Sequence, residues 1–192
     1  MATQSEELLQ FIHEHVYRYR QEPFTLASGR QSRHYFNCKK ITLAPAPLGL
    51  LARVIIEETL PNLSLPEPEA VGGLTLGADP IAYAVALEYF TRGRTVYPLV
   101  ARKEAKDHGT GRQVEGEVER ISGLLVLDDV ITTGGSTLKA VAAFRKVGLR
   151  VDRALCIVDR EEGGRENLAA EGVELLSIFK KSDFQSEERS GD

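Results

Sequence analysis

From about residue 70 onward, apolar runs alternate with helical segments, and this alternation limits the possible folds more than any other feature of the sequence. The runs are apolar at consecutive positions, which is typical of strands buried on both faces. A parallel sheet covered by helices on both sides is therefore predicted. In such sheets ligands bind beyond the carboxyl ends of the strands, so a functional site is expected there. The predicted strands are 70–74, 95–101, 123–127, 151–158 and 173–179, and the helices between them are 80–90, 136–147 and 165–171.

The N-terminal part has a different pattern. An apolar stripe from Leu8 to Tyr19 predicts an amphipathic helix over residues 5–20. Two short strands, 24–27 and 33–37, are expected around a Ser-Gly turn, and a second helix is expected over 48–60.

We expect the whole chain, residues 1–192, to form one domain. It would consist of an N-terminal part, an α/β core and a polar tail that frays, with the bounds 1–45, 46–180 and 181–192.

Composition narrows the class of protein. The formal net charge of −4 does not favour non-specific nucleic-acid binding. The two cysteines, Cys38 and Cys156, are far apart in the sequence, which favours a reducing compartment over a disulfide scaffold or a zinc site. The N-terminus does not resemble a signal peptide, and no apolar run has the roughly 20 residues of a membrane span. These features predict a cytoplasmic protein that binds neither membranes nor nucleic acid.

The stretch "LLVLDDVITTGGSTLKA" places two carboxylates beside an anion-binding turn. Asp128 and Asp129 come at the end of a predicted strand, and residues 132–137 lead into a helix. Glycines, hydroxyl side chains and the helix N-terminus together make a nest for a phosphate. The spacing fits neither a Walker loop nor a dinucleotide-binding loop. The two aspartates suit a sugar diol or a magnesium ion, so the predicted ligand is a phosphorylated sugar, with a metal. The alternative is an ordinary strand–turn–helix.

Within this stretch, "VLDDVITTGGST" resembles the phosphoribosyl-pyrophosphate (PRPP) signature of the type I phosphoribosyltransferases. The resemblance implies a parallel sheet flanked by helices, with a small N-terminal hood and a flexible catalytic lid. It also implies that Asp128 and Asp129 hold the ribose hydroxyls and act in catalysis, with Mg2+ held mainly by the substrate and through water rather than by direct protein ligands. The residues implied to bind the rest of PRPP here are Val130, Ile131, Thr132, Thr133, Gly134, Gly135, Ser136 and Thr137.

The segment "VARKEAKDHGTGRQVEG" resembles the lid of the orotate phosphoribosyltransferases. Its cations would suit a pyrophosphate leaving group. In that family the lid reaches across a homodimer interface, which implies a homodimer here. By resemblance, Lys106 and His108 are catalytic, and both bind PRPP together with Arg102 and Lys103. The alternative is a solvated surface hairpin.

Three further segments resemble the same family. "FTLASGRQSRHYFN" is similar to the hood, where Tyr35 and Phe36 would cover the base, although both could simply pack in the core. "IVDREEGG" is similar to the segment whose arginine, Arg160, pairs with the orotate carboxylate, and Thr132 would also contact orotate. The alternative for Arg160 is a surface ion pair.

The third segment, "VGGLTLGADPIA", is similar to the pyrophosphate loop, and the alternative is a simple strand-to-helix turn. Here Thr75, Gly77 and Ala78 would offer backbone amides. The chain departs from the family where many members have lysine, with Ala27 in the hood and Gly77 in this loop.

Together these segments predict transfer of phosphoribosyl from PRPP to orotate, giving orotidine 5′-monophosphate and pyrophosphate in pyrimidine (UMP) biosynthesis. Two alternatives stay open, a phosphoribosyltransferase for another base and a PRPP-sensing regulator without turnover.

Overall fold

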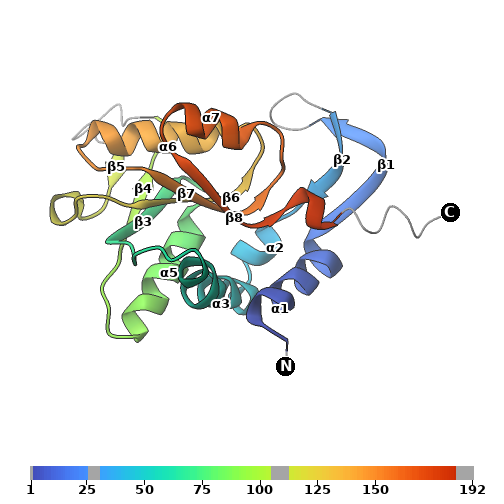
Figure 1. Cartoon of the computed structure of the whole chain (residues 1–192), viewed down its shortest axis with the longest axis horizontal. Helices are drawn as coiled ribbons and strands as arrows, with labels where there is room; N and C mark the ends of the chain where they lie inside the picture. The colour runs from blue at the N-terminus through green and yellow to red at the C-terminus, as the bar shows by residue number, and fades with distance from the viewer. Residues whose placement is uncertain (1, 26–30, 105–112, 185–192) are drawn as a thin grey trace.

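A six-stranded sheet runs through the centre of the molecule, with helices on both faces (Figure 1). The computed structural model describes residues 2–25, 31–104 and 113–184. The strands lie in the order β5-β4-β3-β6-β7-β8, and all neighbours are parallel except β5, which runs antiparallel to β4. Their bounds are β3 Ala70–Leu74, β4 Tyr97–Ala101, β5 Val114–Glu115, β6 Leu125–Ile131, β7 Arg153–Asp159 and β8 Glu174–Lys180.

The order of the parallel strands creates a crevice at one end of the sheet. Along the chain, β4 is added on one side of β3, and β6, β7 and β8 are added on the other side. The loops that follow β3 and β6 therefore leave the sheet toward opposite faces and open a gap between them. In doubly wound sheets ligands bind at this switch point.

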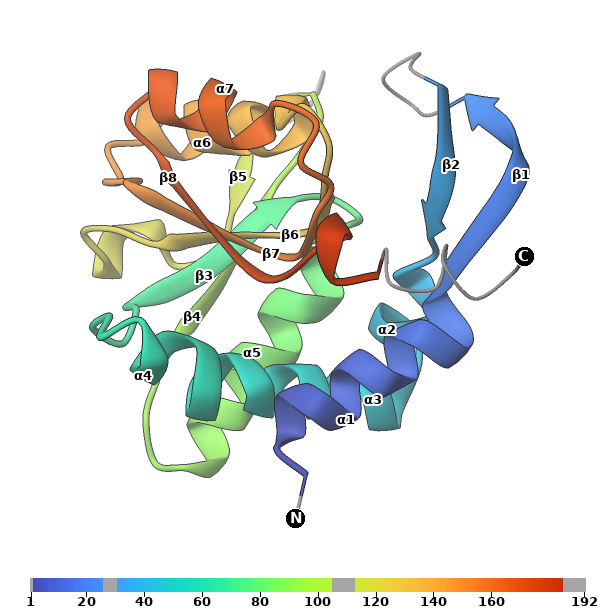
Figure 2. The same ribbon diagram turned by 45° about the vertical axis from the view of Figure 1, so that its right-hand side comes forward.

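The helices form two layers, as Figure 2 shows, and each layer covers its own hydrophobic core. The helices α6 and α7 cover one face, where Val141, Phe144 and Leu168 are buried. The other face is covered by α1, α3 and α5, where Leu8, Leu51 and Ile81 are buried. Their bounds are α1 Gln4–Phe11, α3 Pro45–Arg53, α5 Asp79–Thr91, α6 Gly135–Lys146 and α7 Gly164–Ala170.

Two glycines let β3 sit tightly between its neighbours. A Cβ on Gly72 would lie 2.2 Å from the carbonyl oxygen of Leu99, and one on Gly73 would lie 2.2 Å from that of Leu127. A side chain at Gly72 would push β3 away from β4, and one at Gly73 would push β3 away from β6, across the crevice. The "VGG" of the sequence thus has a packing role in the centre of the sheet.

The predicted strands and helices of the core are confirmed within a few residues, with one difference that matters. Strand β6 extends to Ile131, so Asp128 and Asp129 lie inside the strand rather than after it. The strand stays in register with β7 on either side of Asp129, with Asp128 opposite Cys156 and Val130 opposite Val158. The acid pair is therefore held by the sheet itself.

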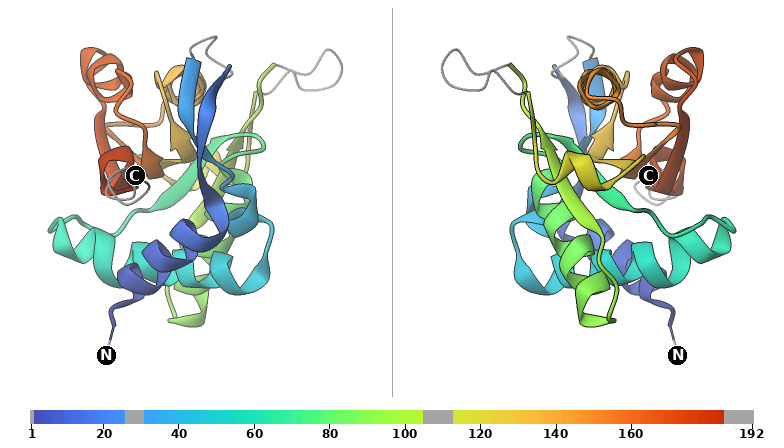
Figure 3. Two further views of the ribbon diagram at one scale, coloured as in Figure 1. Left: turned by 90° about the vertical axis from the view of Figure 1, so that its right-hand side faces the viewer. Right: turned by 90° about the vertical axis from the view of Figure 1, so that its left-hand side faces the viewer.

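The helix predicted over 5–20 is wrong in its last turn. After α1 a π-helical turn, Ile12–Val16, leads into strand β1, Tyr17–Thr25. This strand pairs antiparallel with β2, Gln31–Phe36, and the pair forms a separate two-stranded ribbon. Pairing with a strand further along the chain overrides the local helical pattern. Figure 3 shows the β1–β2 pair from two opposite sides of the molecule.

The tail was expected to fray from residue 181 onward, and this is wrong for its first four residues. Residues 181–184 form a 3₁₀ turn, and Phe184 is fully buried. Its ring lies 5.4 Å from that of Tyr17 and 5.2 Å from that of Phe36. A buried aromatic cluster therefore holds the end of the core against the N-terminal ribbon. Residues 185–192 lie outside the described residues.

The remaining elements are short. The helix predicted over 48–60 consists of α3, a π-helical segment Val54–Thr59 and the short helix α4, Leu60–Asn62. Helix α2, Lys39–Thr42, the 3₁₀ turn Val118–Arg120 and strand β5 were not predicted. Within the described ranges, no helix combines the length and the apolar character needed to cross a membrane.

Candidate active site

Asp128 and Asp129 form the centre of the candidate site. The hydroxyl of Thr137, in the first turn of α6, donates to Oδ2 of Asp128 at 2.7 Å. The backbone N–H of Asp129 donates to the other oxygen, Oδ1, at 3.0 Å, and the N–H of Val130 donates to Oδ1 of Asp129 at 2.8 Å. Asp128 is thus fixed through both of its oxygens, whereas Asp129 is held through one and is less buried.

Burial strongly affects the charge of Asp128. Desolvation, reinforced by the neighbouring Asp129, raises the pKa of its carboxyl group from 3.8 to about 7, while the hydrogen bond from Thr137 opposes the change. Two carboxylates close together at a buried strand end resist joint ionisation. A ligand that donates hydrogen bonds or brings positive charge would relieve that repulsion.

The turn after β6 has the features of an anion nest. Gly134 adopts a left-handed conformation, with φ of 78°, and caps α6 without a side-chain hydrogen bond to the first helical amides. Those amides and the positive end of the helix dipole are therefore available to an anion. The side-chain amide of Asn167 on α7 donates to the carbonyl of Thr133 at 2.9 Å, which fixes the turn from outside.

The structure brings the predicted phosphate-binding residues together at this turn. Val130 and Ile131 end β6, Thr132 to Gly134 form the turn, and Gly135 to Thr137 begin α6. The start of α7 presses against them, because a Cβ on Gly164 would lie 2.7 Å from the carbonyl oxygen of Thr132.

The loop between β3 and α5 lies directly against the acid pair. A Cβ on Gly77 would stand 3.2 Å from Oδ1 of Asp128 and 3.2 Å from Oδ1 of Asp129. The backbone of Gly77 therefore approaches both carboxylates closely. This approach places the predicted pyrophosphate loop and the predicted ribose site side by side.

Two of the three amides expected to bind pyrophosphate are engaged elsewhere. The N–H of Thr75 donates to the carbonyl of Ala101 at 2.9 Å, and that of Ala78 donates to Leu74 at 3.3 Å. The Thr75 hydroxyl donates to Asp79 at 2.6 Å. Among the described residues, Gly77 alone of the three makes no backbone–backbone hydrogen bond through its amide. Binding of pyrophosphate by the amides of Thr75 and Ala78 stays a prediction, and in this structure both amides already have backbone acceptors.

Arg160 stands at the end of the neighbouring strand β7. Its backbone N–H donates to the carbonyl of Ile131 at 2.9 Å, and its guanidinium is buried, with 4% of the side chain exposed. Nη2 pairs with Glu162 at 2.9 Å and donates to Ser32 on β2 at 2.7 Å. Desolvation lowers the pKa of Arg160, and the Glu162 carboxylate opposes that change. The alternative of a surface ion pair is wrong, because the group is buried under the ribbon.

The two aromatic residues of the hood have different surroundings. Phe36 is buried in the cluster with Tyr17 and Phe184, as the packing alternative expects. Tyr35 is 37% exposed, and the guanidinium of Arg20 lies 5.7 Å from the centre of its ring. Contact of either residue with a base stays a prediction.

The predicted lid begins as a hairpin arm at the edge of the sheet. The N–H of Arg102 donates to the carbonyl of Gln113 at 2.9 Å, and its Nε pairs with Glu115 at 3.0 Å. Lys103 is exposed beside it. Lys106 and His108 lie outside the described residues, as does Ala27 of the hood.

Sequence reasoning missed Ser32, Glu162 and Asn167. A buried arginine needs a counter-charge and acceptors, and Glu162, two residues after Arg160, was the available signal. For Ser32 and Asn167 the sequence carries no such signal, because their partners are distant.

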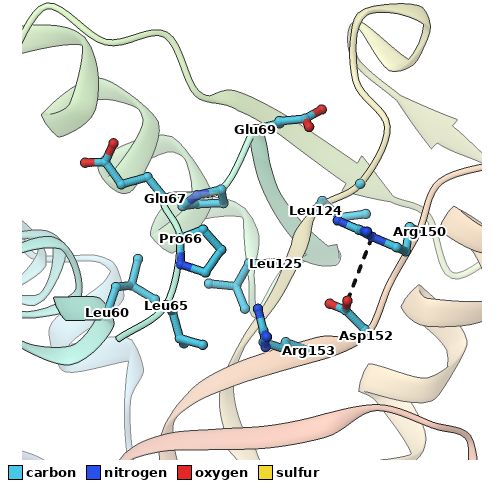
Figure 4. A pocket seen from close by; sticks show the side chains of 12 residues that line it. Leu60, Leu65, Pro66, Glu67, Glu69, Leu124, Leu125, Arg150, Asp152 and Arg153 are labelled. Carbon is cyan, nitrogen blue, oxygen red and sulfur yellow. Dashed lines mark ion pairs between the residues drawn. The ribbon is translucent and has the colours of Figure 1, made fainter. Parts of the chain in front are cut away.

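A cavity of about 90 Å³ lies at the amino ends of the strands, at the opposite end of the sheet from this site. Figure 4 shows the side chains that line it. Leu65 and Pro66 form one wall, and on the other Arg150 pairs with Asp152 at 3.8 Å. None of the predicted site residues lines it.

A mainly parallel sheet of this order, with an acid pair at the switch point between the turn that begins α6 and the Gly77 loop, is the fold of the type I phosphoribosyltransferases. No family model matches the chain. An orotate phosphoribosyltransferase from Leptospira biflexa is 59% identical over 179 residues, which cover 93% of this chain and 96% of the relative. One from Aquifex aeolicus is 44% identical and covers 96% of this chain and 99% of the relative. The chain belongs to the orotate phosphoribosyltransferase family.

Solved structures agree with this assignment. The orotate phosphoribosyltransferase of Mycobacterium tuberculosis in complex with Fe(III) dicitrate is 32% identical, with a TM-score of 0.76, and the match covers 95% of this chain and 99% of that one. The same enzyme in complex with PRPP is 30% identical, with a TM-score of 0.71, and the match covers the same shares of the two chains. The predicted sheet of parallel strands flanked by helices is thereby confirmed, whereas the flexible lid stays a prediction.

Proposed function

We propose that this chain transfers the 5-phosphoribosyl group of PRPP to orotate, giving orotidine 5′-monophosphate and pyrophosphate in pyrimidine biosynthesis. The observation that carries the proposal is the acid pair, which lies between the nest that begins α6 and the loop of Gly77. A phosphorylated sugar with a second anionic group is the ligand that satisfies all three features.

The ribose would be held at its hydroxyls by Asp128 and Asp129, and its 5-phosphate by the amides and hydroxyls of residues 132–137. Because Asp129 is less constrained than Asp128, it is the better candidate to stabilise positive charge that develops on the ribose. The Gly77 amide would face the leaving pyrophosphate. Catalysis then rests on positioning and electrostatic stabilisation, without a covalent nucleophile.

Magnesium fits this site as a partner of the substrate. Within the described ranges, no group of three or more His, Cys, Asp or Glu side chains could hold a metal ion. The oxygens of Asp128 and Asp129 suit Mg2+ only in combination with substrate oxygens or water. When bound, the ion would neutralise charge on the pyrophosphate.

The base would be selected at the end of β7. Arg160 would pair with the orotate carboxylate, Thr132 would contact the ring, and Tyr35 and Phe36 belong to the ribbon above the site. The burial of Arg160 supports this role, because a desolvated guanidinium binds a carboxylate more strongly than an exposed one.

An apolar face on α5 supports a homodimer. Tyr83, Leu87 and Phe90 lie on one side of this helix and are 53%, 64% and 68% exposed. A stripe of this kind on a helix that is also buried on its other side marks an interaction surface. By the resemblance to the family, the lid of each subunit, with Lys106 and His108, would act in the site of its partner. We expect the dimer to act in the cytoplasm.

The proposal is tested by incubating the purified chain with PRPP, Mg2+ and either orotate, uracil or adenine. Consumption of orotate with release of pyrophosphate is expected, and the other two bases should stay unused. Use of uracil or adenine in its place would make the chain a different phosphoribosyltransferase. Binding of PRPP without turnover of any base would indicate a regulator.

A further inference from the structure

Three oxygen acceptors surround one nitrogen of the Arg160 guanidinium, Nη2. Nη2 lies 2.7 Å from Oγ of Ser32, 3.0 Å from the carbonyl oxygen of His34 and 2.9 Å from Oε1 of Glu162. Ser32 and His34 belong to β2 of the ribbon, whereas Glu162 belongs to the loop after β7. The guanidinium therefore ties the ribbon to the core from a buried position.

The Ser32 hydroxyl is itself fixed in place. It accepts from the N–H of His34 at 3.1 Å and donates to the carbonyl oxygen of the same residue at 3.3 Å. With the bond from Arg160, the hydroxyl uses its one donor and both of its acceptor positions. Of the three contacts to Nη2, the one with Ser32 is the shortest.

The Nε of Arg160 differs from Nη2, which has three acceptors. This donor is buried and has no hydrogen-bond partner among the described residues. Buried donors almost always have partners, so an acceptor from outside the chain, a ligand group or a water, has a place beside Nε. A carboxylate binds an arginine in the plane of the guanidinium, so groups that fix this plane decide where Nε points.

We propose that Ser32 is a positioning residue for orotate selection, which holds the Arg160 guanidinium by Nη2 so that Nε faces the carboxylate of the base. This inference rests on the proposed function. The ribbon would then also orient the substrate-recognising guanidinium of Arg160, because a movement of β2 would rotate that group.

The test compares Ser32→Ala with Ser32→Thr, which restores a hydroxyl. Gln31→Ala is a matched control, because Gln31 is the preceding residue of β2 and, among the described residues, its side chain bonds within the ribbon, to Thr25 at 2.8 Å. Ser32→Ala should raise KM for orotate about tenfold, the loss of a hydrogen bond to a charged group, with kcat and KM for PRPP changed less than about twofold. Ser32→Thr should recover most of the loss, and Gln31→Ala should have no effect on KM for orotate.

A coupling measurement separates positioning from general support of the fold. In an Arg160→Ala background, Ser32→Ala should change KM for orotate no further, because its effect passes through Arg160. Equal increases in both Michaelis constants, or full additivity with Arg160→Ala, would overturn the proposal. If Ser32→Ala does not fold, Ser32→Cys, with a weak acceptor of similar shape, should show the same selective defect. A wild-type chain that does not consume orotate would refute the proposed function itself. If the wild type consumes orotate but the Ser32 variants show no selective rise in KM for orotate, the inference about Ser32 alone is refuted.

Discussion

Asparagine in place of Asp128 is expected to make the folded chain more stable at pH 8 and far less active. The substitution keeps the shape of the side chain and removes its charge. The oxygen of the new amide can still accept from the N–H of Asp129, and its NH₂ group can donate to the Thr137 hydroxyl, so both contacts of the wild type have a replacement.

The size of the effect follows from burial. The pKa of Asp128 rises from 3.8 to about 7 on folding, chiefly by desolvation, so the folded state holds the proton more tightly than the unfolded state. The wild type therefore loses stability as the pH rises from about 4 to about 7, and above that range the loss is constant. A pKa rise of this size corresponds to a loss of at most about 4 kcal/mol in the free energy of unfolding. Asparagine does not ionise, so the variant does not incur this loss. We expect a gain of about 1–4 kcal/mol at pH 8 and a smaller gain at pH 5.

Urea unfolding of both proteins at pH 5 and pH 8 measures the difference. Asp152→Asn is the control, because its side chain is 55% exposed at the other end of the sheet, and no such pH-dependent gain is expected. Turnover of Asp128→Asn should fall at least about tenfold, which is about 1.4 kcal/mol of barrier. If Asp128→Asn gains no more stability at pH 8 than at pH 5, folding does not raise the pKa of Asp128 and the reasoning fails.

Four further changes probe other parts of the molecule. Arg160→Ala should raise KM for orotate far more than KM for PRPP, because a broken buried charge pair costs about 2–5 kcal/mol, and equal increases would make Arg160 structural. Phe184→Ala should lower the free energy of unfolding by about 3–5 kcal/mol in urea, and a loss below about 1 kcal/mol would contradict its place in the core. Mixing inactive Lys106→Ala and Asp129→Asn dimers should restore activity as subunits exchange, and no recovery in proven mixed dimers would place the lid over its own subunit. Leu87→Glu should yield monomers in sedimentation, whereas an intact dimer would exclude the apolar face of α5 as the interface.

The parts of the fold that the sequence predicted are those set by neighbouring residues. The buried strands of the sheet and the helices between them follow from apolar runs and their spacing. The acid pair and the nest lie within ten residues of each other, from Asp128 to Thr137, so one stretch of chain carries both. Local chemistry is enough to predict such a site.

The parts that were missed depend on distant partners. Tyr17 looks helical in its own neighbourhood, yet it is strand because it pairs with Phe36. Ser32 meets Arg160 across 128 positions of sequence, and no local pattern could have indicated that contact. The amide of Thr75 is taken by Ala101 through the sheet, which a reading of the loop alone overlooks.

The burial of Phe184 has a consequence for how the protein is made. The ribbon that contacts Arg160 leaves the ribosome early, but the ring that packs on Tyr17 and Phe36 follows only after the last strand of the sheet. Contacts between such distant segments form late, because the intervening chain must be ordered first. We therefore expect the nascent chain to gain its sheet and phosphate nest before its ribbon is locked in place.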